Sequence, residues 1–143
     1  MYKFKQGYIA NKQLKKIVSI LQDEVDINWH ITKMVLDQDF SETDFWTNLN
    51  LALKCDYFLI DTNSRNTFEL GVVWTINYLR KMLLRSGHKN AVQQLDKFGI
   101  VDKAIVSLGN DHPNKTIDIL VKDQGKKFKN LSALATYIKN KEK

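Results

Sequence analysis

The stretch that decides the fold is YFLIDTNSRNTFELG, residues 57–71. It begins with a short apolar run that ends in an acid, Tyr57–Asp61, a pattern typical of a buried strand. A polar loop follows, and an apolar helical pattern begins after Asn66. This order places Glu69 in the first turn of a helix, close to the carboxyl end of a strand. In open α/β sheets, ligands bind at that edge.

A carboxylate at this position has three uses: nucleophile, general base or helix cap. Asn66 and Glu69 have the spacing of a capping box, in which the glutamate side chain bonds the Asn66 amide. Capping is compatible with nucleophilic chemistry, because the helix dipole favours the ionised carboxylate that a nucleophile requires. Asp61 closes the strand and faces the same edge. Its alternative role is that of a turn-forming aspartate bonded to its own loop.

Strands and helices are expected to alternate along the chain. The expected strands are 2–10, 26–36, 57–61, 103–108 and 116–121. The expected helices are one capped by Asn11, one opened by a capping box at 41–44 and running to Cys55, a long one from 67 to 86, and shorter ones at 90–98 and 130–139. This order predicts one α/β domain over residues 1–143. We expect a doubly wound (flavodoxin- or Rossmann-like) sheet of about five mainly parallel strands, with helices on both faces.

Composition indicates an ordinary globular protein. The chain has 143 residues, of which 43% are hydrophobic and 27% charged, and no apolar run is long enough for a membrane span. The start of the chain lacks a signal-peptide pattern, and the single cysteine, Cys55, is expected to be a buried small apolar residue. We therefore expect a cytoplasmic protein without a membrane partner.

The net charge is +6, and lysines crowd the last third of the chain. Such a surface attracts phosphates or nucleic acid, or it is simply a solvated face. The lysines are not interleaved with stacking aromatics and no nucleic-acid motif is present, which favours the solvated face.

The sequence does not support several classes of enzyme, both cofactor-dependent and hydrolytic. The three histidines, His30, His88 and His112, lie far apart and lack metal-ligand spacing with Cys55. The chain contains no G-x-S-x-G, Walker A or G-x-G-x-x-G motif. Neither a cofactor nor a metal is expected.

Three segments together resemble the nucleoside 2-deoxyribosyltransferase family, which includes deoxynucleoside 5'-monophosphate N-glycosidases. They are Tyr8-Ile9-Ala10 on the first strand, Cys55–Asp61, and Phe68-Glu69-Leu70-Gly71 at the head of the long helix. The resemblance implies that Glu69 attacks C1' of a deoxyribose and that Tyr8 hydrogen-bonds and orients it. From its position alone, Tyr8 is either such a partner or a core tyrosine with its hydroxyl at the rim.

Three departures from the family pattern bear on the resemblance. The family has an aspartate in the helix before the third strand, which handles the proton on the base. Here Asn48 takes that place, and an amide bonds a base without delivering a proton. Asp44, one turn earlier, could substitute. The loop after the first strand, Asn11-Lys12-Gln13, lacks the family's glycines, although Lys12 could meet a 5'-phosphate. The stretch 80–102 is longer than the family's equivalent.

The sequence leaves three functions open. The first is an enzyme acting on the N-glycosidic bond of a nucleoside or its monophosphate, by base exchange or hydrolysis, with Asp61 and Asn48 as substrate contacts. The second is a nucleotide-binding module that has kept the crevice and lost the chemistry. The third is binding of an acidic partner by the basic tail. The resemblance implies an oligomer, and the apolar helix from Glu69 to Leu84 is wide enough to serve core and interface, so at least a dimer is expected.

Overall fold

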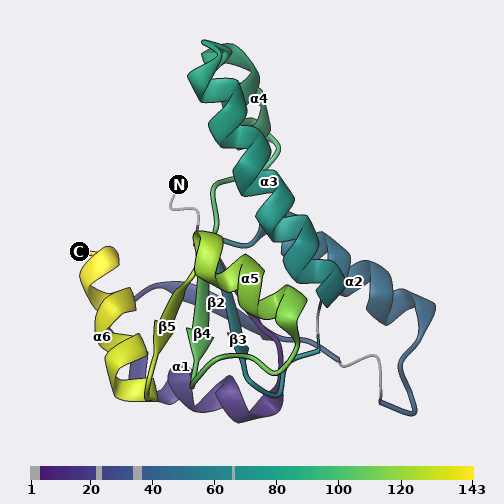
Figure 1. The fold of residues 1–143 in the computed structure, drawn as a ribbon, viewed down its shortest axis with the longest axis vertical. Coiled ribbons are helices and arrows are strands. Elements are labelled where there is room, and N and C mark those ends of the chain that lie inside the picture. The colour runs from purple at the N-terminus through teal and green to yellow at the C-terminus, as the bar shows by residue number, and fades with distance from the viewer. Residues whose placement is uncertain (1–3, 22–23, 34–36, 66) are drawn as a thin grey trace.

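A computed structural model describes residues 4–21, 24–33, 37–65 and 67–143 of the chain. Five strands form one all-parallel sheet in the order β2-β1-β3-β4-β5 (Figure 1). The strands are β1 (Lys5–Ile9), β2 (Ile27–Ile31), β3 (Tyr57–Asp61), β4 (Ala104–Leu108) and β5 (Lys126–Phe128). The helices are a 3-10 turn η1 (Lys12–Lys15), α1 (Lys16–Leu21), α2 (Glu42–Lys54), α3 (Thr67–Arg85), α4 (Lys89–Lys97), α5 (Lys115–Gln124) and α6 (Leu131–Lys141). The predicted doubly wound α/β class is confirmed.

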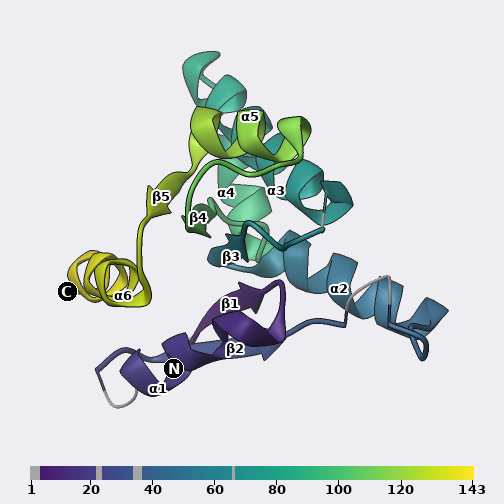
Figure 2. The same cartoon turned by 60° about the horizontal axis from the view of Figure 1, so that its bottom comes forward.

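Two hydrophobic cores lie on opposite faces of the sheet. Helices α1 and α6 cover one face, and α2, α3 and α5 cover the other (Figure 2). Successive side chains of a strand point to opposite faces, so Phe58 and Ile60 of β3 enter the α2-α3-α5 core while Tyr57 and Leu59 enter the α1-α6 core. Every residue of β3 is buried, as expected for a central strand covered on both sides.

The order of the strands reverses between β1 and β3. From β1 the chain first steps outward to β2, and then returns to the other side of β1 as β3. In sheets of this kind a crevice opens beyond the carboxyl ends of the strands at such a switch point. Close packing on β1 requires Gly7, because a Cβ there would overlap the ring of Trp29 on the neighbouring strand.

The predicted strand at 116–121 is wrong. Residues 115–124 form α5, whose N-cap is Asn114 with its side chain accepting from the Ile117 amide. Ile117 and Val121, one turn apart, are the buried residues of this helix. The β-branched residues of the segment resembled a strand, but parallel strands need a crossover between them, and α5 supplies it. The last strand is the three-residue β5, at the edge of the sheet.

Most other boundaries agree with expectation to within a few residues, but β2 ends at Ile31, whereas that strand was expected to run from 26 to 36. The capping box between Ser41 and Asp44 is present at the start of α2, and Asn11 caps η1. Gly87 and Gly99, with φ of 79° and 78°, follow the ends of α3 and α4. Of the expected first two strands, residues 2–3 and 34–36 lie outside the described part, as does Asn66.

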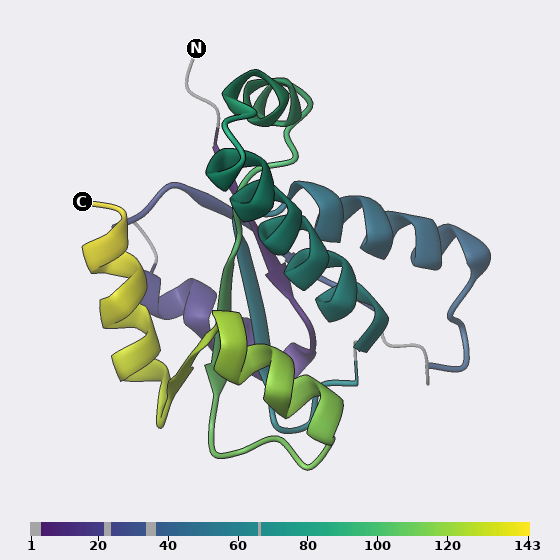
Figure 3. The ribbon, with the colours of Figure 1, turned by 45° about the horizontal axis from the view of Figure 1, so that its top comes forward.

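The long stretch 80–102 folds back on α3. The end of α3 and all of α4 project beyond the sheet (Figures 1 and 3). Arg80 joins the two helices, since its Nη1 lies 2.8 Å from Asp96 Oδ1 and 3.0 Å from the carbonyl oxygen of Ile100. Within the described residues, no helix combines the length and apolar character needed to cross a membrane.

Candidate functional site

Of the cavities at the carboxyl edge of the sheet, two are lined by Asn63. The β3–β4 cavity, of about 580 Å³, lies between the loop after β3 and residues 112–114 of the loop after β4. Its lining contains one cation, Arg65, and no acid, and it includes Thr67, the first residue of α3, and Asn114, the N-cap of α5. The β1–β2 cavity, of about 280 Å³, is lined by Asn11, Lys12, Gln13, Thr32, Asp37 and Asn63.

A buried hydrogen-bond network joins the ends of β1 and β3 between the cavities. Asp61 Oδ1 accepts from the Asn11 side-chain amide at 2.7 Å, from the Asn63 backbone amide at 2.9 Å and from the Ser64 hydroxyl at 3.1 Å. Asn11, Asp61 and Ser64 are all buried. The bond to Asn63 is the contact of a turn-forming aspartate. Asp61 therefore shapes the walls of both cavities, whether or not it also touches a ligand.

His112 fastens the far wall of the β3–β4 cavity. Its Nδ1 accepts from the backbone amide of Asn114 at 2.9 Å, so this nitrogen carries no proton. Its Nε2 must then hold the proton and donate it to the carbonyl oxygen of Ser64, 2.9 Å away. A neutral imidazole with this tautomer ties the loop after β4 to the loop after β3. The sequence alone marks His112 only by its lack of metal-ligand spacing and gives no sign of this role.

Glu69 is buried in the first turn of α3, with 3% of its surface exposed. Helical side chains lean toward the N-terminus of their helix, and that end of α3 lies at the carboxyl edge of β3. Among the described residues, only its own backbone amide bonds its carboxyl group, and no cation lies beside it. Burial raises its pKa, and its own backbone amide opposes this rise only in part. Neither cavity includes Glu69 in its lining, and Asn66, its expected capping partner, lies outside the described residues.

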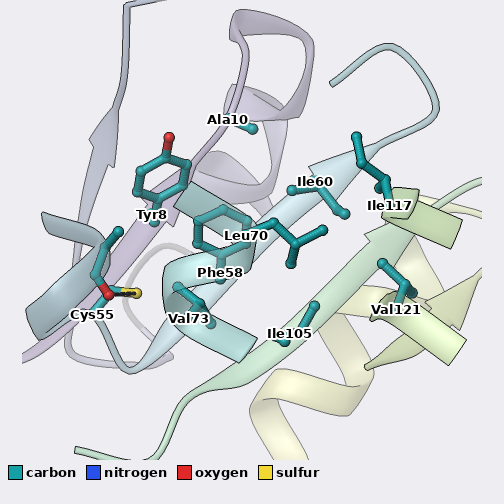
Figure 4. Packing of buried hydrophobic residues seen from close by; sticks show 11 residues of the cluster. Tyr8, Ala10, Cys55, Phe58, Ile60, Leu70, Val73, Ile105, Ile117 and Val121 are labelled. Atoms are coloured by element: carbon teal, nitrogen blue, oxygen red, sulfur yellow. Dashed lines mark hydrogen bonds between the residues drawn. The ribbon is translucent and has the colours of Figure 1, made fainter. Parts of the chain in front are cut away.

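Tyr8 lies in the same core as the helix that carries Glu69. Its ring stacks on Phe58 of the neighbouring strand at 4.3 Å between centroids and is fully buried. Figure 4 shows both rings in the cluster that also contains Leu70, the residue after Glu69. The two residues expected to be catalytic thus belong to the same side of the sheet, near its switch point.

Two predicted site residues on α2, Asn48 and Asp44, line neither the β1–β2 nor the β3–β4 cavity. Asn48 is buried and donates to the carbonyl oxygen of Lys33 at 2.9 Å. It lines a separate cavity of about 560 Å³ between α2 and β2. Asp44 accepts from the backbone amide and the hydroxyl of Ser41, which hold its pKa below the usual range, and it lies 3.7 Å from Lys33. Both side chains fasten α2 to the end of β2 rather than lining the β1–β2 or β3–β4 cavity.

The structure therefore brings Asn11, Lys12 and Asp61 together around the β1–β2 cavity. It adds Arg65 and His112, which the sequence did not single out as site residues. The one sequence signal for them is their position: Arg65 lies in the loop after β3, and His112 lies in the loop after β4. Across the described part of the chain, no group of three or more His, Cys, Asp or Glu residues could hold a metal ion.

Comparison with known proteins adds no identification. No family model, curated protein or solved structure matches this chain. The resemblance to the nucleoside 2-deoxyribosyltransferase family consequently depends on the residues of the three segments themselves.

Proposed function

We propose that the protein is a cytoplasmic enzyme that acts on the N-glycosidic bond of a deoxynucleoside or its 5'-monophosphate, with Glu69 as the nucleophile. The observation that supports this proposal is the burial of the Glu69 side chain in the first turn of α3, at the carboxyl edge of the sheet, with no cation beside it among the described residues. A buried carboxyl group costs stability unless it is paired, and such groups cluster at functional sites.

The proposed reaction has two displacements. In the first, an oxygen of ionised Glu69 bonds to C1' as the C1'–N bond breaks, and the base leaves with the bonding electrons and gains a proton. In the second, water or another base attacks C1', releases Glu69 and loses a proton. Two displacements retain the configuration at C1'. Tyr8 would orient the Glu69 carboxylate, and a hydroxyl donor near a carboxylate favours its ionised form.

The cations at the edge suit a phosphorylated substrate. Lys12 lines the β1–β2 cavity and Arg65 the β3–β4 cavity, so a 5'-phosphate has one candidate cation on either side of Asn63. If a phosphate binds at either place, the corresponding Ala variant should raise KM for monophosphates and leave KM for unphosphorylated nucleosides unchanged.

The decisive experiment is a screen of deoxynucleosides and their 5'-monophosphates for released base, with and without an acceptor base. We expect Glu69→Gln to abolish turnover, because the amide keeps the shape of the side chain and removes the nucleophile. Glu42→Gln, which changes an exposed residue of α2, is the matched control and should turn over normally. Base release by a correctly folded Glu69→Gln variant at the wild-type rate would refute the proposal.

The pH dependence of that reaction follows from the direction of the pKa shift. The nucleophile must be ionised, and burial raises the pKa of Glu69. The rate should therefore fall on the acid side at a pH above the ordinary titration of a glutamate, and kcat/KM against pH should show this limb. A rate that is constant down to the usual glutamate range would contradict a role for this buried carboxylate.

A nucleotide-binding module is the second candidate. Two observations favour it: Glu69 lines neither cavity, and Asn48 stands where an acid would handle the proton on the base. Calorimetry with deoxynucleotides distinguishes the two functions, because a module binds them without forming product. Substitution of Asp61 should then weaken binding, since Asp61 fixes the walls of both cavities.

We also propose that the protein assembles as at least a dimer. Long helix α3 is apolar on its buried side and exposes Tyr78, Leu79 and Met82 to solvent, each about half-exposed. Sedimentation or light scattering measures the assembly directly, and a monomer at all accessible concentrations would refute it.

A further inference from the structure

One side of α3 carries two aromatic residues followed by two cations. Trp74, Tyr78, Lys81 and Arg85 follow one another at spacings of four, three and four residues. Such spacings place the four side chains along a single side of a helix. The residues of α3 that face the sheet, such as the buried Val73, lie on a different side. We call this row of two aromatic residues and two cations the α3 stripe.

The two aromatic rings of the α3 stripe are stacked and held in place. The ring centroids of Trp74 and Tyr78 lie 5.2 Å apart, with 8° between the ring planes. The indole Nε1 of Trp74 donates to Asp123 Oδ2 at 2.7 Å, and the side chain of Gln124 donates to the Trp74 carbonyl oxygen at 3.3 Å. The end of α5 therefore fixes Trp74. Tyr78 is 46% exposed and is the more open ring of the pair.

The two cations of the α3 stripe have no counter-charge within the described part of the chain. Lys81 and Arg85 are exposed, and none of the ion pairs among the described residues includes either of them. Their charges are not needed to hold α4, because Arg80 makes that contact through Asp96 and Ile100. The helix dipole favours a cation in the last turn, such as Arg85, but not Lys81 one turn earlier.

Positive charge is concentrated in the part of the chain that projects beyond the sheet (Figure 1). Residues 80–100 contain five of the 22 lysines and arginines, but only one of the 16 aspartates and glutamates. That single acid, Asp96, is paired with Arg80. Lys89 and Lys97 of α4 are exposed and add their charge to that of the stripe. A projecting segment with one sign of charge attracts a polyanion.

A polyanion that also carries flat rings is complementary to both halves of the α3 stripe. Each nucleotide of a single strand offers a base that stacks on an aromatic ring and a phosphate beside it. The bases of a duplex stack on one another instead, so their faces do not reach Tyr78. An acidic peptide would pair with the cations and leave the ring unused. Lys81 and Arg85 lie about 6 Å apart along the helix axis, so a strand stacked on Tyr78 passes both.

We propose that the α3 stripe binds single-stranded nucleic acid, with a base stacked on Tyr78 and neighbouring phosphates bound by Lys81 and Arg85. Trp74 is a positioning residue, since it supports the Tyr78 ring from behind. Binding of this kind tolerates any sequence, because every base has a face that can stack. The proposal goes beyond the chemistry at Glu69 and does not depend on it, because Glu69 lies at the opposite end of α3 from the two cations.

The first test measures binding of a labelled oligo(dT) by fluorescence anisotropy at low salt. Tyr78→Ala should weaken binding roughly 5- to 100-fold, the range for the loss of one base stacked on an aromatic ring. Tyr78→Phe keeps the ring and should bind like the wild type. The matched control is Phe68→Ala, because Phe68 is 55% exposed on another side of α3, and it should also bind normally. A wild type that does not bind, or equal losses in Phe68→Ala and Tyr78→Ala, would overturn the proposal.

The second test separates the two cations from the net charge of the chain. The double variant Lys81→Ala/Arg85→Ala should make the plot of log Kobs against log salt shallower by about 1.4, because each phosphate contact on a single strand contributes about 0.7. Tyr78→Ala should leave this slope unchanged. The matched control, Lys15→Ala/Lys16→Ala, removes the same charge from exposed positions on η1 and α1. If the control reduces the slope and the affinity equally, or if duplex DNA binds more tightly than oligo(dT), the proposal is wrong.

Discussion

Two polar networks hold the loops at the carboxyl edge of the sheet, and they differ in how they are built. Between β1 and β3, one carboxylate, Asp61, is buried and receives three hydrogen bonds from neutral donors. Beyond β4 and β5, Asp111 and Asp118 form ion pairs with Lys122 and Lys127 near the surface. Buried hydrogen bonds thus fix the loop at the switch point. The outer loop is held by ion pairs near the surface, which solvent and salt screen.

The largest effect is expected at Asp61. Asp61→Ala removes the acceptor of the part-buried Asn63 amide and leaves the buried Asn11 side chain only its longer bond to Ser64, which should cost about 2–4 kcal/mol of unfolding free energy. Urea denaturation measures it. Asp61→Asn keeps an oxygen for the same donors and should cost much less. Equal losses in the two variants would show that the charge, rather than the acceptor geometry, holds this loop.

The same comparison shows why part of the site could not be predicted from the sequence. The polar loop after β3 was predicted correctly, and Asp61 was placed at the binding edge. The bond between Asn11 and Asp61 could not be predicted, because it joins residues fifty positions apart that meet only when β1 and β3 become neighbours. The role of His112 depends in the same way on the positions of two loops that belong to different strands.

The fold was predicted better where one residue pattern dominated. Strand β3 agrees with the predicted bounds because its apolar run is continuous and its ends are polar. The helix α5 was mistaken for a strand because Thr116, Ile117 and Ile119 have high strand propensity, whereas its decisive signals were the Asn114 cap and the spacing of Ile117 and Val121. Strand β5 has three residues, two of them lysines, and only its pairing with β4 makes it a strand.

Glu69 extends the comparison, since it is buried like Asp61 but, among the described residues, only its own backbone amide bonds its carboxyl group. A carboxyl group whose pKa is raised in the folded state stabilises the fold fully below its unfolded pKa, near 4.5, and loses that contribution as the pH rises through the folded value. Glu69→Gln removes this loss. Relative to wild type, the variant should therefore gain stability as the pH rises from the acid range to neutral. Thermal unfolding of both proteins across this range measures the difference.

An unchanged difference between the two proteins at all pH values would mean that Glu69 ionises as easily in the folded chain as in the unfolded one. The matched control is Glu42→Gln, at an exposed position in the first turn of α2. It should show no comparable trend, because an exposed carboxylate does not lose its hydration on folding.

The smallest effect is expected at Asp118. Lys122 and Lys127 lie 2.9 Å and 2.8 Å from its carboxylate oxygens, and their hydrogen bonds hold its pKa well below the usual range. A lowered pKa contributes stability above the unfolded value that disappears as the pH falls through the folded one. Asp118→Asn should therefore lower the melting temperature slightly near neutral pH and low salt, and not at acid pH. High salt should also reduce the difference, because it screens surface charges. If Asp118→Asn instead proved as harmful as Asp61→Ala, the expectation of a small, screened contribution from the surface charge of Asp118 would be wrong, because the asparagine keeps an oxygen acceptor for the His112 amide.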